Sequence, residues 1–251
     1  METLREQLRA IASRSQSRQT FWMEFINSRG LQQVAEIGVY RGDFARTLLE
    51  GCPGLTRYYM IDPWKHLTNW NKPANHPDAE LETYYQEAIA KTDFAPDKRV
   101  VLRGKTVEVI GSIPDQTLDF AYIDGDHTLR GITIDLISLY SKIRIGGFLG
   151  GDDFCSSIWE HRSSFEPTLV FPLAVYFAEA VGATIFALPY SQFCLHKTAD
   201  RNFSFIDLTS NYADTSLLGQ VAPPKLLKLA MSERFPGTVG LLRKAKALFS
   251  L

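Results

Sequence analysis

The stretch VAEIGVYRGDFARTLLE, residues 34–50, combines a short apolar run, a turn with two glycines and an amphipathic helical pattern. Further apolar runs follow at residues 58–61, 100–103, 118–123, 147–150 and 183–188. Helical patterns separate most of them, as in LRGITIDLISLYSKI at 129–143. Strands that alternate with crossover helices are typical of a parallel, doubly wound sheet covered on both faces. We therefore predict an α/β fold.

The end of this pattern predicts one antiparallel strand. In ATIFALPYSQFCLHK, residues 183–197, only Pro189 and Tyr190 separate two β-rich runs, which favours a hairpin. The expected sheet is therefore seven-stranded, mostly parallel and doubly wound, with an antiparallel last strand.

The two ends of the chain predict helices outside this sheet. Residues 1–29 show helical spacing of apolar residues and form a predicted N-terminal helical extension. The main domain then covers 30–198, and 199–251 form a helical tail whose last part, 225–251, is basic. We expect the tail to pack on the core or on a second copy of the chain; a membrane-surface or anion-binding helix is the alternative.

Composition excludes several classes of protein. The chain has 251 residues, 45% hydrophobic residues and a formal net charge of -1, so one substantial core is expected and a general nucleic-acid binder is not. Its three cysteines have no metal-site spacing and predict buried thiols in a reducing compartment. The apolar stretch 168–188 is interrupted by Pro172, Glu179 and Gly182, which favours a buried helix followed by a strand over a membrane span. We predict a cytoplasmic protein.

Ligands of open α/β sheets bind at the carboxyl ends of the strands. Gly38 and Gly42 follow the first strand and permit a close backbone approach to a ligand, although glycine after a strand is more often only a turn. Asp62 ends the second strand and suits the two ribose hydroxyls of a nucleoside, or else begins the turn at Pro63. After the third strand, the turn Gly104–Thr106 either borders an adenine or caps the next helix with Thr106.

The fourth and fifth strands end in acidic residues. Asp124 and His127 follow the fourth strand, and Asp152 and Asp153 follow the fifth. Three carboxylates that converge with no cation between them repel one another, and a hard divalent cation such as Mg²⁺ or Ca²⁺ would relieve that repulsion. A neutral imidazole beside them is suited to act as a general base. We expect Asp126 to cap the helix that begins near residue 129.

A long loop, PWKHLTNWNKPANHP at 63–77, follows the second strand directly. Such loops are often lids or binding loops, and some are only surface excursions. Its residues Trp64 and Trp70 are candidates for stacking on a sugar face, but loop tryptophans pack on their own domain at least as often.

Together, EIGVYRGDF, Asp62, YIDGDHTLRG and GGFLGGDDF resemble the class I S-adenosylmethionine-dependent methyltransferases over residues 30–198. They are most similar to the metal-dependent sugar O-methyltransferases of the macrocin and mycinamicin type. The resemblance implies that Asp124, Asp152 and Asp153 bind Mg²⁺ and that His127 deprotonates the acceptor, with Asp124 also catalytic. It implies a cofactor site formed by Glu36, Gly38, Tyr40, Gly42, Asp62, Gly104, Lys105, Thr106 and Asp124.

The predicted function is therefore Mg²⁺-dependent O-methylation of a sugar or glycoside hydroxyl, with S-adenosylmethionine as methyl donor. A catechol or other phenol is the alternative acceptor. A nicotinamide-dependent oxidoreductase is disfavoured because the first strand lacks GxGxxG and the acidic triad would have no role. A non-catalytic binding module is the remaining alternative. We also expect a homodimer, because relatives are often dimers, and no nucleic-acid or membrane partner.

Overall fold

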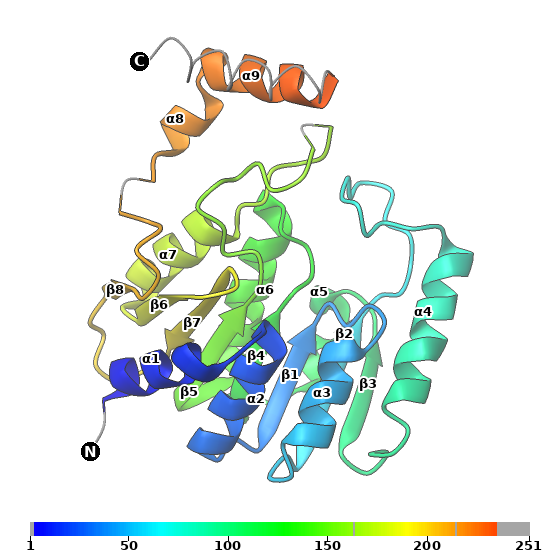
Figure 1. Ribbon diagram of the computed structural model, residues 1–251. Helices are drawn as coiled ribbons and strands as arrows, with labels where there is room; N and C mark the ends of the chain where they lie inside the picture. Colours follow the sequence, from blue (N-terminus) through cyan, green and yellow to red (C-terminus); the bar gives the residue numbers. More distant parts are fainter. Residues whose placement is uncertain (1–2, 163, 214, 235–251) are drawn as a thin grey trace.

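The computed structural model describes residues 3–162, 164–213 and 215–234. Its centre is an eight-stranded sheet in the order β3-β2-β1-β4-β5-β7-β6-β8, with helices on both faces (Figure 1). The strands are β1 (Gln33–Ile37), β2 (Arg57–Asp62), β3 (Arg99–Arg103), β4 (Leu118–Ile123), β5 (Ile143–Gly151), β6 (Thr184–Leu188), β7 (Gln192–His196) and β8 (Ser204–Asp207). The helices are α1 (Leu4–Arg14), α2 (Arg18–Arg29), α3 (Asp43–Gly51), α4 (Asp78–Lys91), α5 (Thr106–Val109), α6 (Leu129–Lys142), α7 (Val170–Val181), α8 (Leu217–Val221) and α9 (Pro223–Arg234), with a short 3-10 helix at Ile110–Ser112.

Alternating side chains of the parallel strands enter two separate cores. On β1, Val34 faces the core formed with α1 to α4, whereas Ala35 and Ile37 face the core formed with α5 to α7. Both faces of β1 are buried because helices cover both sides of the sheet, and both of its edges are paired, with β2 and with β4. Burial on both faces explains why the sequences of these strands are nearly continuous apolar runs. The predicted α/β class and doubly wound sheet are confirmed.

The sheet differs from the prediction at its far edge. An eighth strand, β8, pairs in parallel with β6 inside the stretch predicted as a helical tail. It has only four residues, SFID, all of them partly exposed, and so gives almost no periodic signal. The antiparallel strand is confirmed: β7 runs antiparallel to both β5 and β6.

The predicted N-terminal helical segment consists of two helices. The chain breaks between α1 and α2, where Ser17 caps α2 by accepting a hydrogen bond from the Thr20 amide at 3.2 Å. Trp22 and Phe25 of α2 then pack on the sheet, with the Trp22 and Phe120 ring centroids 4.8 Å apart and the Phe25 and Phe148 centroids 5.0 Å apart. The N-terminal helices are therefore part of the main core.

The chain leaves the sheet through α8 and α9, which lie away from the strands at the top of Figure 1. No side chain of α9 is buried. Residues 235–251, which include most of the predicted basic helix, lie outside the described residues. Within the described part of the chain, every helix is too short or too polar to cross a bilayer.

Gly38 has the backbone that the sharp turn after β1 requires. Its φ is +85°, and a Cβ atom there would lie 2.0 Å from the Asp124 carbonyl oxygen. We predict that Gly38→Ala lowers the free energy of unfolding by about 2–4 kcal/mol, because both the backbone and its neighbour must shift. Gly54→Ala is the control: a Cβ there would meet no atom of the described residues within 4 Å, so stability should change by less than about 0.5 kcal/mol. Equal urea-unfolding midpoints for the two variants would contradict this role of Gly38.

Candidate functional site

The sheet register brings the ends of three strands together. Ile37 of β1 is paired with Ile123 of β4, and Ile123 with Gly151 of β5. One residue further on, the Asp124 amide donates to the Ile37 carbonyl at 2.7 Å, and the Asp152 amide donates to the Ile123 carbonyl at 2.9 Å. Asp124 and Asp152 therefore leave the sheet side by side, as the parallel arrangement predicts.

The turn after β1 is joined to the end of β2 through Asp62. Its carboxylate accepts the Tyr40 amide at 2.9 Å and the Trp64 amide at 2.7 Å. Asp62 thus fixes both the glycine turn and the first residues of the 63–77 loop, which is the turn role that the sequence left open. Gly42, with φ +76°, precedes α3.

Glu36 is a buried acid below this turn. The Tyr58 hydroxyl donates to its carboxyl group at 2.7 Å, and the side chain is 1% exposed. Burial raises the pKa of Glu36 to about 8, against the smaller effect of the Tyr58 hydrogen bond. Glu36 is thus mainly neutral at pH 7.

The turn after β3 does not have the helix cap that was one of its two predicted roles. Lys105 occupies the N-cap of α5, and Thr106 lies inside the first turn, so Thr106 does not cap the helix. Its buried hydroxyl instead donates to Asp135 of α6 at 2.6 Å. Gly104 packs closely on α5, where a Cβ would lie 2.6 Å from Val109 Cγ1. The Lys105 backbone amide donates to Glu108 at 2.9 Å.

His127 and Asp153 form a buried pair. His127 Nδ1 lies 2.5 Å from Asp153 Oδ2. Nε2 is buried, lies 4.0 Å from Asp124 Oδ1 and has no hydrogen-bond partner among the described residues. Burial opposes protonation of His127, but the Asp153 carboxylate outweighs it and raises the pKa of His127 above its usual value. Although burial alone would raise it, the pKa of Asp153 is lowered to about 2 by the hydrogen bond to His127. Asp153 also has a positive φ of 55°, a strained backbone found often at functional sites.

A cation from the N-terminal helices lies between the other two acids. Arg18 Nη1 lies 2.8 Å from Asp124 Oδ2 and also forms an ion pair with Asp152. The same nitrogen is 3.5 Å from the Tyr122 hydroxyl. Burial raises the pKa of Asp124 to about 6, and Arg18 acts against this rise. The three predicted metal ligands are therefore engaged separately: Asp124 and Asp152 face Arg18, and Asp153 faces His127.

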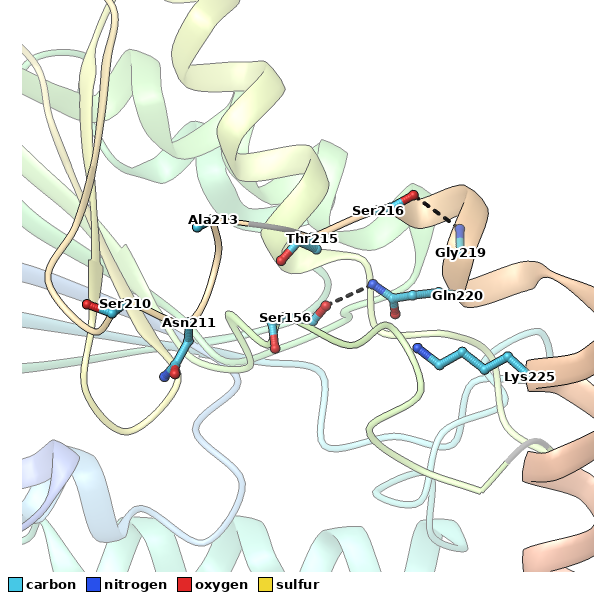
Figure 2. Close-up of a pocket in the computed structure, with 9 residues that line it drawn as sticks. All are labelled: Ser156, Ser210, Asn211, Ala213, Thr215, Ser216, Gly219, Gln220 and Lys225. Carbon is cyan, nitrogen blue, oxygen red and sulfur yellow. Dashed lines mark hydrogen bonds between the residues drawn. The ribbon is translucent and has the colours of Figure 1, made fainter. Parts of the chain in front are cut away.

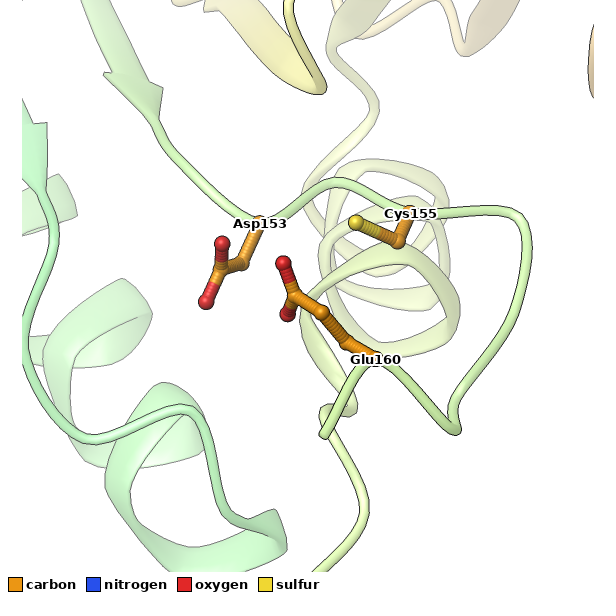
Figure 3. Close-up of side chains that lie close together, drawn as sticks. All are labelled: Asp153, Cys155 and Glu160. Carbon is orange, nitrogen blue, oxygen red and sulfur yellow. The ribbon is translucent and has the colours of Figure 1, made fainter. Parts of the chain in front are cut away.

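A second group of potential ligand atoms lies next to Asp153. Oxygen atoms of Asp153 and Glu160 and the Cys155 sulfur all lie within 4.8 Å of one another (Figure 3). Cys155 is a half-buried thiol, and burial raises its pKa to about 12. The buried ammonium of Lys72 interacts electrostatically with Asp153 and Glu160 and donates to the Thr168 hydroxyl at 3.0 Å.

The 63–77 loop is docked over these residues through Trp70 as well as Lys72. Trp70 Nε1 donates to Asp126 Oδ1 at 2.9 Å, and the Thr128 amide donates to the same oxygen at 3.0 Å. Thr128, and not Asp126, is the N-cap of α6, so the predicted capping role of Asp126 is corrected. Trp64 is 1% exposed and donates to the Tyr40 carbonyl at 2.7 Å, which leaves it unable to stack on a ligand in this arrangement.

A polar cavity of about 440 Å³ lies beyond the loop that follows β5 (Figure 2). Hydroxyl and amide groups predominate in its lining, and Lys225 supplies its charged side chain. Gln220 donates to the Ser156 carbonyl at 2.8 Å and so joins α8 to this loop. The lining residues are Ser156, Ser210, Asn211, Ala213, Thr215, Ser216, Gly219, Gln220 and Lys225.

Three residues of the site were not found from the sequence. Arg18 and Lys72 are single basic residues in polar segments and give no signal there. Gln192 does give a signal in the sequence, because it is a polar residue at the start of the apolar run QFCLH. It is fully buried, accepts hydrogen bonds from Trp22 Nε1 at 2.8 Å and the Tyr122 hydroxyl at 2.7 Å, and donates to Asp152.

Comparison with known proteins finds similarity over the central part of the chain. Residues 35–154 match a family described as a methyltransferase domain. An O-methyltransferase from Bacillus cereus in complex with SAH aligns with 76% of this chain and 88% of its own, at 17% identity and a TM-score of 0.51. The SAH-bound Podospora anserina methyltransferase PaMTH1 aligns with 78% and 87%, at 12% identity and a TM-score of 0.54. These structures have the same Rossmann-like fold. No curated protein sequence matches the chain.

The burial of Glu36 predicts a pH dependence of stability. From pH 4.5 to about 8 the unfolded chain ionises at this position while the folded chain keeps the proton, so stability falls as the pH rises through this range. We predict that Glu36→Gln removes this loss. The free energy of unfolding of the variant, measured relative to the parent, should therefore be higher at pH 8 than at pH 5 by at least about 1 kcal/mol. Urea unfolding at both pH values measures it. Glu50→Gln, at an exposed position, should leave the pH dependence unchanged.

Proposed function

Because residues 35–154 match a family described as a methyltransferase domain, we propose that this chain transfers a methyl group from S-adenosylmethionine to a hydroxyl oxygen. The observation that carries the proposal is His127: its Nδ1 is held by Asp153, and its Nε2 is buried and unpartnered. A buried imidazole nitrogen without a partner is costly, and a substrate hydroxyl would satisfy it. A nicotinamide-dependent oxidoreductase has no support from the family match.

The methyl donor would bind along the ends of β1, β2 and β3. Gly38 and Gly42 allow the close backbone contacts with Asp124 and Ala88 that shape this turn. Asp62 retains acceptor capacity for ribose hydroxyls after receiving the Tyr40 and Trp64 amide hydrogen bonds. We propose as the remaining contacts Glu36, Tyr40, Gly104, Lys105, Thr106 and Asp124. The two aligned structures are SAH-bound, which supports this choice of donor.

In the proposed mechanism, His127 accepts the proton of the acceptor hydroxyl at Nε2. Asp153 fixes the imidazole through Nδ1 and stabilises the imidazolium that results. The two residues thus form a base and the group that orients it. Asp124, 4.0 Å from Nε2, adds negative potential that favours the same protonated state.

We propose Mg²⁺ as an additional cofactor, bound by Asp124 and Asp152 with Asp153 near. The donor set fits, because carboxylate oxygens suit a hard divalent cation and because Arg18 already occupies the space between Asp124 and Asp152 as a cationic group. A bound cation would favour the ionised form of a hydroxyl acceptor. The deprotonated carboxylate of Asp153 would remain the hydrogen-bond partner of His127.

The proposed acceptor is a sugar or glycoside with neighbouring hydroxyl groups. The polar cavity supports this choice, since its hydroxyl and amide lining can exchange hydrogen bonds with a polyol. One of its lining residues, Ser156 (Figure 2), directly follows Cys155 of the acidic group (Figure 3) in the sequence. A catechol or other phenol is the second candidate acceptor, favoured by the O-methyltransferase fold alone.

A cytoplasmic location and a homodimer also remain proposals. Exposed apolar side chains on α8 and α9, such as Leu218 at 80% and Leu227 at 63%, support contact with a second copy. Light scattering on the purified full chain measures the mass of the assembly.

An acceptor screen with labelled S-adenosylmethionine tests the function. We expect transfer to glycosides that carry vicinal hydroxyls, little transfer to catechols, and loss of activity in EDTA that Mg²⁺ restores. Transfer to catechols alone would replace the sugar assignment. Full activity in EDTA would remove the metal from the proposal while leaving methyl transfer in place.

Replacement of His127 tests the base. We predict that His127→Ala lowers kcat by about 10²–10⁴-fold, because no other group accepts the proton at that place. We also predict that Asp153→Asn moves the acid limb of the pH–rate profile to lower pH, because the carboxylate raises the pKa of His127. Asp115→Asn, an exposed residue paired with Lys142, is the control and should leave the profile unchanged. An unaltered profile in Asp153→Asn would contradict the pair.

A further inference from the structure

Arg18 supplies positive charge to the site from an element outside the sheet. It is the first residue of α2, directly after the cap Ser17, and lies 106 positions before Asp124 in the sequence. Its side chain is 29% exposed, and those of Asp124 and Asp152 are 24% and 15% exposed. A guanidinium that bridges two partly buried carboxylates is a strong and geometrically specific contact.

The contact leaves the pair of carboxylates incompletely neutralised. Asp124 and Asp152 carry two negative charges when ionised, and Arg18 carries one positive charge. A divalent cation would balance both carboxylates. Since a guanidinium and a cation cannot occupy the same space between the two oxygens, binding of one excludes the other.

Helix α2 does not depend on Arg18 alone for its position. Trp22, one turn further on, is fully buried against Phe120 and donates to Gln192 at 2.8 Å. Gln192 in turn donates to Asp152. The Arg18 side chain can therefore leave the carboxylates while the rest of α2 remains packed on the sheet.

We propose that Arg18 is a built-in counter-ion for Asp124 and Asp152, and that a divalent cation binds this pair by displacing the Arg18 side chain. The proposal rests on the cation part of the proposed function. As a consequence, the ion pairs of Arg18 restrain the first turn of α2 in the cation-free protein. This restraint is lost when the divalent cation binds. Arg18 is a positioning residue in this scheme and has no role in proton transfer.

Cation affinity tests the displacement. Mn²⁺ serves as the probe, and electron paramagnetic resonance of free Mn²⁺ gives its Kd for the full-length protein after EDTA treatment. We expect Arg18→Met to bind Mn²⁺ about tenfold more tightly than the parent, because the competing cation is gone. Arg14→Met is the matched control: Arg14 of α1 pairs with Glu24 outside the site, and its loss should leave the Kd unchanged.

A second measurement needs no variant. Hydrogen–deuterium exchange of the parent protein should increase at residues 18–21 on addition of Mn²⁺, with no change in the second half of α2. Unchanged exchange there, or equal or weaker Mn²⁺ binding by Arg18→Met, would overturn the proposal. Weaker SAH binding by Arg18→Met with unaltered Mn²⁺ affinity would also overturn the proposal, because Arg18 would then be a cofactor contact.

The two proposals fail in distinguishable ways. If neither the parent nor Arg18→Met binds Mn²⁺, displacement is overturned together with the metal assignment, whereas methyl transfer is measured separately. If the parent binds Mn²⁺ and Arg18→Met binds it no better, the metal assignment stands and only the counter-ion role is lost.

Discussion

The accumulation of negative charge at the ends of β4 and β5 is the constraint on which the site depends. The parallel register fixes Asp124 beside Asp152, and the backbone continues directly into Asp153. Such a concentration of carboxylates at the edge of a buried sheet is stable only with cationic partners. The described chain supplies them from three separate elements: Arg18 from α2, His127 from the loop after β4, and Lys72 from the 63–77 loop.

This division of partners separates two kinds of chemistry within a few residues. Asp153 is committed to His127, where it determines which imidazole nitrogen is free. Asp124 and Asp152 pair with the Arg18 guanidinium. This side chain can move away from them, because an arginine side chain has many rotamers and Arg18 lies partly in solvent. A fixed pair beside an exchangeable one suits an enzyme whose base must be permanently oriented while its acceptor and cofactors come and go.

The sequence was informative where strand ends determine the site and uninformative where distant segments complete it. Gly38, Asp62, Asp124 and Asp152 were predictable because parallel strands place their carboxyl ends at one edge, whatever the lengths of the connections. Arg18 was not predictable, since a basic residue at the start of an amphipathic helix normally faces solvent. β8 escaped prediction for a related reason: an edge strand of four partly exposed residues has no clear alternation.

The N-terminal helices are part of the packed core and also reach the candidate site. Their aromatic residues complete one of the two cores, with Trp22 packed on Phe120 and hydrogen-bonded to Gln192. The first residue of α2, Arg18, reaches the acids at the strand ends. Because the same helix is fixed by burial at Trp22 and by ion pairs at Arg18, a change of charge at the strand ends acts on the helix start without disturbing the core. In the proposed displacement, this separation of a rigid anchor at Trp22 from a side-chain contact at Arg18 would let the site change its occupant while the fold stays intact.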